Sequence, residues 1–199
     1  AELDAPGRRR PVVIVGAGMA GPTLALLLAT RGVPVLLLDD DDTVGLGSRS
    51  VCQAKQSLEI WDRFGIARRM VDKGITWEQG EVYLHDRPIF RFNLQPEPGH
   101  KFPAFVNLQQ YYVEEYLYER WAAEPLIEMR HRNKVVALTG QDNGVTVTVE
   151  TPDGRYDLEA DWLVACDGVR SPVRHLLGLP YPGEVFHDQF LIADIRLED

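Results

Sequence analysis

Three glycines near the start of the chain have the spacing that can hold the phosphates of a dinucleotide. Gly16, Gly18 and Gly21 form a Gly-x-Gly-x-x-Gly pattern within PVVIVGAGMAGPTLALLLATRG. The first glycine permits a tight turn, the second lets the backbone approach a pyrophosphate, and the third lets a helix pack against a strand. Backbone amides of Met19 and Ala20 would face the phosphates at the positive end of that helix's dipole.

A carboxylate follows at the distance that a βαβ unit requires. The apolar run 12–15 predicts a buried parallel strand, residues 19–31 a helix and residues 33–38 a second strand. Asp39 ends the second strand, 23 positions after Gly16. A carboxylate at this place can accept hydrogen bonds from both ribose hydroxyls of an adenosine.

The row of four aspartates that begins with Asp39 narrows the choice of nucleotide. Asp40 is included with Asp39 among the candidate cofactor-binding residues, although the run 40–42 as a whole is typical of a solvated charged segment. Four carboxylates would repel a 2′-phosphate, so NADP bound directly here is disfavoured. The glycine pattern alone leaves NAD and FAD both open.

Three further stretches carry polar residues that could contact a flavin nucleotide. Arg49 lies in GSRSVCQAKQSLEIWDRFGI, Gln110 in NLQQYYVEEYLYER, and Asp167 with Gly168 in ACDGVRSPVRHLLG. A guanidinium can bind a pyrophosphate bidentately where helix amides only partly offset its charge. With the glycine pattern, these stretches resemble the FAD-dependent aromatic hydroxylases (class A flavoprotein monooxygenases) over nearly the whole chain. The similarity is closest to 3-(3-hydroxyphenyl)propionate hydroxylases.

This resemblance implies roles for particular residues. Arg49 would reach the FAD pyrophosphate, and Gln110, or Gln109 one position earlier, would touch the flavin–ribityl region. Asp167 would bond the ribityl chain, within an Asp-Gly motif that relatives also use with the nicotinamide cofactor. Val136 completes the set of expected cofactor-binding residues. Arg170 would shield the flavin site or meet NAD(P)H, and a structural ion pair is the alternative.

The activity that the resemblance implies is hydroxylation of a phenolic aromatic compound. NADH or NADPH would reduce FAD, and a flavin C4a-hydroperoxide would transfer oxygen to the ring, so the cofactor carries the chemistry. The sequence contains no Ser-His-Asp or metal-ligand pattern, and no catalytic residue is assigned. The expected partners are a small aromatic substrate and molecular oxygen, with no nucleic acid or membrane; a homodimer is considered.

One departure from the family concerns the length of the chain. The family carries a later Gly-Asp motif that holds the flavin from the other side, and no Gly-Asp dipeptide occurs here. An amino-terminal portion of a longer enzyme is therefore expected, inactive on its own. Three alternatives remain: a non-catalytic or incomplete FAD-binding module, an NAD-linked Rossmann dehydrogenase, and a flavin-dependent reductase or halogenase.

The elements that would position these residues define an α/β fold. We expect a Rossmann-like FAD-binding domain with a central parallel sheet and a β-meander, plus the beginning of a mixed or antiparallel substrate-domain sheet. The FAD-binding domain is assigned to residues 1–77 and 101–180, and the partial substrate-binding domain to 78–100 and 181–199. In the meander, an apolar strand from Trp162 to Cys166 should return to the parallel sheet.

The composition agrees with an ordinary globular protein. The chain has 199 residues, 45% of them hydrophobic and 26% charged, with a net charge of −9 that disfavours nucleic acid and anionic membranes. No apolar run approaches the roughly 20 residues of a membrane-spanning helix. The polar first ten residues predict a loose leader, and two cysteines suit a reducing compartment, so a cytoplasmic location is expected.

Overall fold

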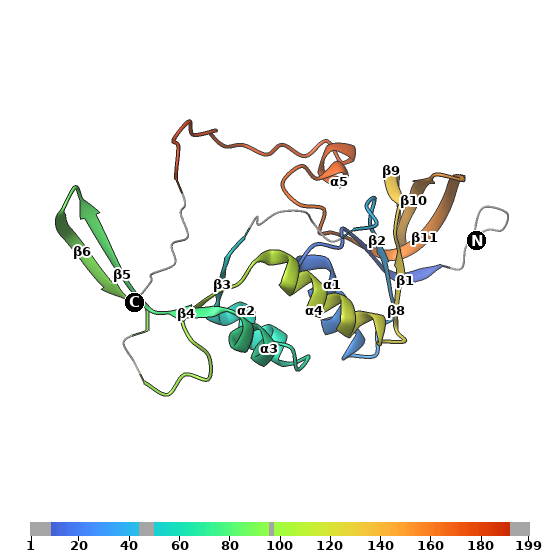
Figure 1. Ribbon diagram of the computed structural model, residues 1–199. Helices are drawn as coiled ribbons and strands as arrows, with labels where there is room; N and C mark the ends of the chain where they lie inside the picture. The colour runs from blue at the N-terminus through green and yellow to red at the C-terminus, as the bar shows by residue number, and fades with distance from the viewer. Residues whose placement is uncertain (1–8, 44–49, 96–97, 192–199) are drawn as a thin grey trace.

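A six-stranded sheet lies at one end of the computed structural model, which describes residues 9–43, 50–95 and 98–191 (Figure 1). Its strand order is β8-β2-β1-β11-β10-β9 (Figure 1). The strands are β1 (Arg10–Val15), β2 (Val35–Leu38), β8 (Ile127–Arg130), β9 (Lys134–Gln141), β10 (Gly144–Thr151) and β11 (Gly154–Ala165). The first four in spatial order are parallel, and β11, β10 and β9 are antiparallel. The expected parallel sheet with a β-meander is confirmed.

Four helices cover one face of the parallel strands, and the meander packs with the short fifth helix against the other. The helices are α1 (Ala20–Ala29), α2 (Lys55–Asp62), α3 (Ala67–Lys73), α4 (Gln110–Ala122) and α5 (Pro172–Leu176). Because side chains alternate along a strand, Val12 and Ile14 of β1 join the core beneath the helices. Val13 and Val15 join the core formed with the meander and α5. This burial on both faces explains why β1 and β2 are continuous apolar runs.

Strand β11 is longer than the sequence pattern suggested. The sequence pattern predicts one strand at RYDLEA (residues 155–160) and another at Trp162–Cys166, but a single strand runs from Gly154 to Ala165. Its first half pairs with β10 and its second half with β1. Trp162 lies on β11 yet remains 72% exposed, so this part of the strand is not buried on both faces as its apolar character predicted.

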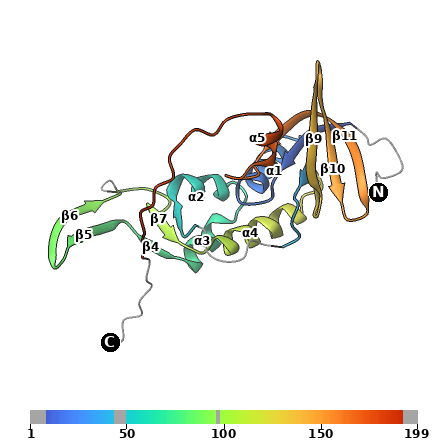
Figure 2. The same ribbon diagram turned by 90° about the horizontal axis from the view of Figure 1, so that it is seen from above.

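Two smaller antiparallel sheets lie beyond the helices. A three-stranded sheet, in the order β3-β7-β4, consists of β3 (Cys52–Ala54), β7 (Phe105–Asn107) and β4 (Ile75–Trp77). A hairpin consists of β5 (Gln79–Leu84) and β6 (Arg87–Asn93), and it projects from the helical body in both ribbon views (Figures 1 and 2). The sequence Asp86-Arg87-Pro88 predicts a turn near these residues, and the turn falls at His85 and Asp86, where His85 has a φ of +50°.

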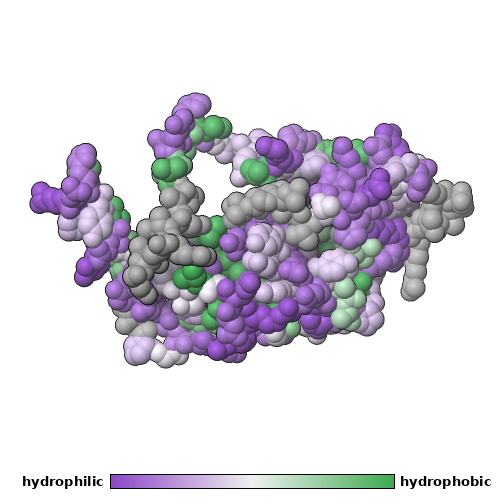
Figure 3. Space-filling view, in the orientation of Figure 1, coloured by the Kyte–Doolittle hydropathy of each residue, from purple (hydrophilic) through white to green (hydrophobic). Residues whose placement is uncertain are grey.

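After α5 the chain runs away from the large sheet toward the β4–β7 end of the molecule (Figures 1 and 2). New strand material was expected from Glu184 onward, but residues 181–191 form no strand, and residues 192–199 lie outside the described part. This arm exposes large apolar side chains, and Figure 3 shows apolar colour along it. They are Leu179, Tyr181, Val185, Phe186, Phe190 and Leu191. Among the described residues, no helix is long and apolar enough to span a membrane.

Candidate functional site

The glycine turn between β1 and α1 has the geometry that its spacing predicted. Gly16 has a φ of +105°, and a Cβ atom there would lie 2.4 Å from the carbonyl oxygen of Cys166. A Cβ atom on Gly21 would lie 1.9 Å from the carbonyl oxygen of Gly16. Gly18 differs, because no atom lies within 4 Å of the position its Cβ would take. Two glycines thus allow close packing, and the third leaves open space beside the backbone.

A cavity of about 610 Å³ adjoins this turn. It brings together nine of the sequence-predicted cofactor residues: Gly16, Gly18, Met19, Ala20, Asp39, Asp40, Gln110, Asp167 and Gly168. Of the other three, Gly21 packs beneath the turn, and Arg49 lies outside the described residues. On β9 it is Val135, and not the predicted Val136, that lines the cavity.

Asp39 is held in place by the backbone around it. Its Oδ2 accepts a hydrogen bond from the N–H of Ala17 at 2.5 Å, and its Oδ1 accepts one from the N–H of Asp41 at 2.9 Å. The N–H of Gly16 donates to the carbonyl oxygen of Leu38 at 2.8 Å, which joins the glycine turn to the end of β2. The half-buried carboxylate therefore has a defined orientation at the edge of the cavity.

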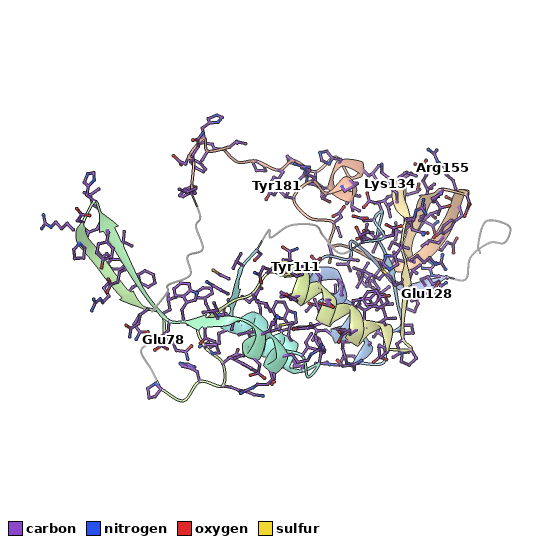
Figure 4. All side chains as sticks on the ribbon, viewed as in Figure 1. Glu78, Tyr111, Glu128, Lys134, Arg155 and Tyr181 are labelled. Carbon is purple, nitrogen blue, oxygen red and sulfur yellow. The ribbon has the colours of Figure 1, made fainter. Side chains whose placement is uncertain are left out.

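The start of α1 leaves backbone donors for an anion. Its N-cap residue, Met19, makes no capping hydrogen bond through its side chain, and the first turn contains no acidic residue. Two cationic side chains, Lys134 and Arg170, also line the cavity. Figure 4 shows Lys134 beside α5 and Tyr111 in the first turn of α4, which are two elements that bound the cavity. Helix amides and cations together suit a pyrophosphate.

The Asp-Gly motif lies where β11 ends beside β1. The N–H of Cys166 donates to the carbonyl oxygen of Val15 at 2.7 Å, and Gly168 has a φ of +77°. Oδ2 of Asp167 accepts a hydrogen bond from the N–H of Val173 at 2.9 Å, which ties the motif to α5. Burial, and next the charge of Asp167, raise the pKa of the Cys166 thiol.

Gln110 begins α4 with its side chain engaged. It lines the cavity, whereas Gln109 is exposed and does not. Its Nε2 donates to Oε1 of Glu114 at 2.6 Å. Reasoning from sequence missed Glu114, although the four-residue spacing on a predicted helix could have indicated it. It also missed Asn133, Lys134 and Cys166, which reach the cavity only because β9 begins there and β11 ends there.

Strand, glycine turn, helix and strand, with a carboxylate at the end of the second strand, define a dinucleotide-binding α/β domain. A family model described as "FAD binding domain" matches residues 9–199. The chain therefore belongs to this FAD-binding domain family.

Curated relatives include proteins named as monooxygenases or hydroxylases. The chain is 27% identical to a 3-(3-hydroxy-phenyl)propionate/3-hydroxycinnamic acid hydroxylase of Mycolicibacterium smegmatis, over 97% of this chain and 34% of the relative. It is 32% identical to a 12-dehydrotetracycline 5-monooxygenase/anhydrotetracycline 6-monooxygenase of Streptomyces rimosus, over 96% and 37%. The chain thus spans little more than a third of these relatives' length.

Solved structures agree with this assignment. A p-nitrophenol 4-monooxygenase from Pseudomonas putida superposes with a TM-score of 0.81 at 27% identity, over 89% of this chain and 46% of that one. The flavin-dependent monooxygenase PieE, solved with FAD and substrate, superposes with a TM-score of 0.77 at 27% identity, over 90% and 34%.

Proposed function

We propose that this chain is the FAD-binding portion of a monooxygenase that hydroxylates a phenolic aromatic compound, with NADH or NADPH as reductant. The observation that carries the proposal is the gathering of nine predicted cofactor residues around one cavity. The family match and the names of the relatives support the same reading. A compound resembling 3-(3-hydroxyphenyl)propionate is the proposed substrate.

The residues around the cavity fit FAD in charge and shape. The uncapped start of α1 and the open space at Gly18 suit a pyrophosphate close to the backbone. Asp39 has the place and the fixed orientation to accept ribose hydroxyls. We place Gln110 and Asp167, from α4 and the end of β11, along the ribityl chain.

Bound FAD would supply hydride acceptance and oxygen activation. The chain's own residues would bind and orient it. Asp39 would hold the adenosine end, and Asp167 would remain joined to α5 through the N–H of Val173. Lys134 and Arg170 would balance negative charge in a cavity that otherwise carries several carboxylates.

We also propose that residues 78–100 and 181–199 belong to a second, substrate-binding sheet. The β5–β6 hairpin leaves Val82, Leu84, Ile89 and Phe90 between 43% and 60% exposed. A two-stranded hairpin with such faces is marginally stable alone, and further strands would cover it. The apolar side chains of the arm after α5 are also exposed, and the strands of such a sheet would cover them.

FAD binding by the purified protein is the first test. We expect flavin absorbance bands in the protein, FAD in the supernatant after heat release, and quenching of added FAD fluorescence on titration. Asp39→Ala should weaken binding, while Asp153→Ala, in the exposed β10–β11 turn, removes one carboxylate that does not line the cavity and should not. Thermal stabilisation by NAD but not by FAD would contradict the proposal.

A second measurement separates an enzyme from a non-catalytic FAD-binding module. A monooxygenase oxidises NADH or NADPH in the presence of 3-(3-hydroxyphenyl)propionate and forms a hydroxylated product. Because this portion is expected to be inactive on its own, the measurement uses the whole protein that contains it. A whole protein that binds FAD but shows neither would be a binding module, and this outcome would contradict the proposed activity while leaving the cofactor assignment intact.

A further inference from the structure

Gln110 and Glu114 lie one turn apart on α4 and share a short hydrogen bond. Nε2 of Gln110 donates to Oε1 of Glu114 at 2.6 Å, and both side chains are half-buried. An ionised carboxylate can only accept hydrogen bonds, so the amide nitrogen of Gln110 must be the atom that faces it. The bond therefore fixes the orientation of the Gln110 amide, with Nε2 directed toward Glu114.

Gln110 and Glu114 line two neighbouring cavities. Gln110 lines the cavity of about 610 Å³. Glu114 lines a second cavity, of about 420 Å³, which shares Gly18, Asp39 and Asp41 with the first. Glu114 thus lines the cavity that the Asp-Gly motif does not line. With its nitrogen engaged there, the amide presents Oε1 as an acceptor.

We propose that Glu114 is a positioning residue that sets the orientation of the Gln110 amide, so that Oε1 accepts a hydrogen bond from a hydroxyl of the FAD ribityl chain. The inference rests on the proposed function. A glutamine amide can turn over at little steric cost, and the turned form would offer donors in place of an acceptor. A charge-assisted bond to a carboxylate, stronger than a neutral one, selects a single form.

A purely structural role makes a different prediction. Pairs of side chains four residues apart stabilise a helix whatever lies in the neighbouring cavity. If Glu114 only stabilised α4, its removal would lower thermal stability, and its effect on FAD would add to that of removing Gln110. If it acts through Gln110, the two effects cannot add, because residues in one hydrogen-bond network are coupled.

The test is a double-mutant cycle read by FAD affinity, from quenching of flavin fluorescence in the purified protein. We expect Glu114→Ala to weaken FAD binding about tenfold, as for loss of a charge-assisted hydrogen bond. The double variant with Gln110→Ala should bind no more weakly than Gln110→Ala alone. Glu114→Gln, whose amide can donate as well as accept and so no longer selects one orientation of Gln110, should recover only part of the affinity. Glu115→Ala, an exposed neighbour on α4, is the matched control and should bind as the unsubstituted protein does.

A second readout requires no FAD. In the apo protein, the side-chain amide resonances of Gln110 in a ¹⁵N-correlated NMR spectrum should move in Glu114→Ala and stay in place in Glu115→Ala. Unchanged amide resonances, unchanged FAD affinity in Glu114→Ala, or additive effects in the double variant would each overturn the inference. Failure of the unsubstituted protein to bind FAD would instead reject the proposed function, and with it the ligand assigned to Gln110.

Discussion

Asp39, at the end of β2, accepts a hydrogen bond from the backbone N–H of Ala17, inside the glycine turn that follows β1. The carboxylate expected to hold a ribose is therefore also the group that fixes the turn beside it. Its other oxygen accepts from the N–H of Asp41, so the same side chain orders the chain on both sides. Asp39 is therefore expected to contribute both to cofactor binding and to the stability of the glycine turn.

Asp39→Ala should consequently affect both stability and FAD affinity. Loss of one bond to a partly buried amide and one to an exposed amide should lower the free energy of unfolding by about 1–2 kcal/mol. The FAD dissociation constant should rise at least about tenfold, since a bidentate acceptor is lost. Urea denaturation and flavin fluorescence measure the two effects. A variant as stable as the unsubstituted protein would show that the bond to Ala17 contributes little.

Alanine at Gly16 and at Gly18 should have opposite consequences. At Gly16, positive φ and a Cβ atom 2.4 Å from the Cys166 carbonyl oxygen should destabilise the fold by about 3 kcal/mol. At Gly18 the methyl group meets no protein atom, so the melting temperature should change by less than about 2 °C. That methyl group occupies the open side of the turn, and FAD affinity should fall about tenfold. Equal loss of stability in both variants would contradict this distinction.

Asp167 allows its contact with α5 to be separated from its proposed contact with FAD. Asp167→Ala removes the acceptor for the N–H of Val173 and should cost about 1 kcal/mol, as for a lost helix cap. Ser171→Ala removes another capping acceptor of the same helix, for the N–H of Arg174, and should cost about as much. FAD affinity should fall only in Asp167→Ala, because Ser171 does not line the cavity. Equal FAD affinities in the two variants would argue against a flavin contact by Asp167.

The two cysteines should differ in their reaction with a disulfide reagent such as Ellman's reagent. Cys52 is exposed and should react first. Burial, with the neighbouring Asp167, raises the pKa of Cys166. Because the thiolate is the reacting form, the rate at Cys166 should still rise at pH values where an ordinary thiol is already fully ionised. The variant Cys52→Ser removes the fast reaction, so that only the slower reaction of Cys166 is measured.

FAD should slow the Cys166 reaction further, since this residue lines the same cavity as the predicted cofactor residues. Protection by FAD but not by an equal concentration of NAD is the expected result. A Cys166 that reacts as fast with FAD as without it would show that the bound flavin leaves the end of β11 accessible.

Much of the site was predictable because its residues follow strands with strong local patterns. The apolar runs of β1 and β2, the glycine spacing and the position of Asp39 are all contained within one short stretch, so sequence order already implies spatial order. Asp167 was predictable for a similar reason, since an apolar strand precedes it.

Other features depend on contacts that no local pattern records. Strand β8 is an edge strand with charged Glu128 and Arg130, so it lacks the apolar run of its neighbours. Strands β3, β4 and β7 have three residues each, too few for a periodicity to appear. Lys134 and Asn133 line the cavity because the β8–β9 connection passes beside it, which depends on how β8 pairs with β2.

The double pairing of β11 has a consequence for how the protein folds. Strands β9, β10 and β11 can pair through short turns, whereas Arg10 of β1 must meet Ala160 of β11 across about 150 intervening residues. Closing so long a loop carries the larger entropic cost, and contacts of this range limit folding rates. Gly16 and Asp167 come together only through this same pairing. The cofactor cavity is thus completed by the most distant contact in the sheet, so a nascent chain acquires it only after β11 has been synthesised.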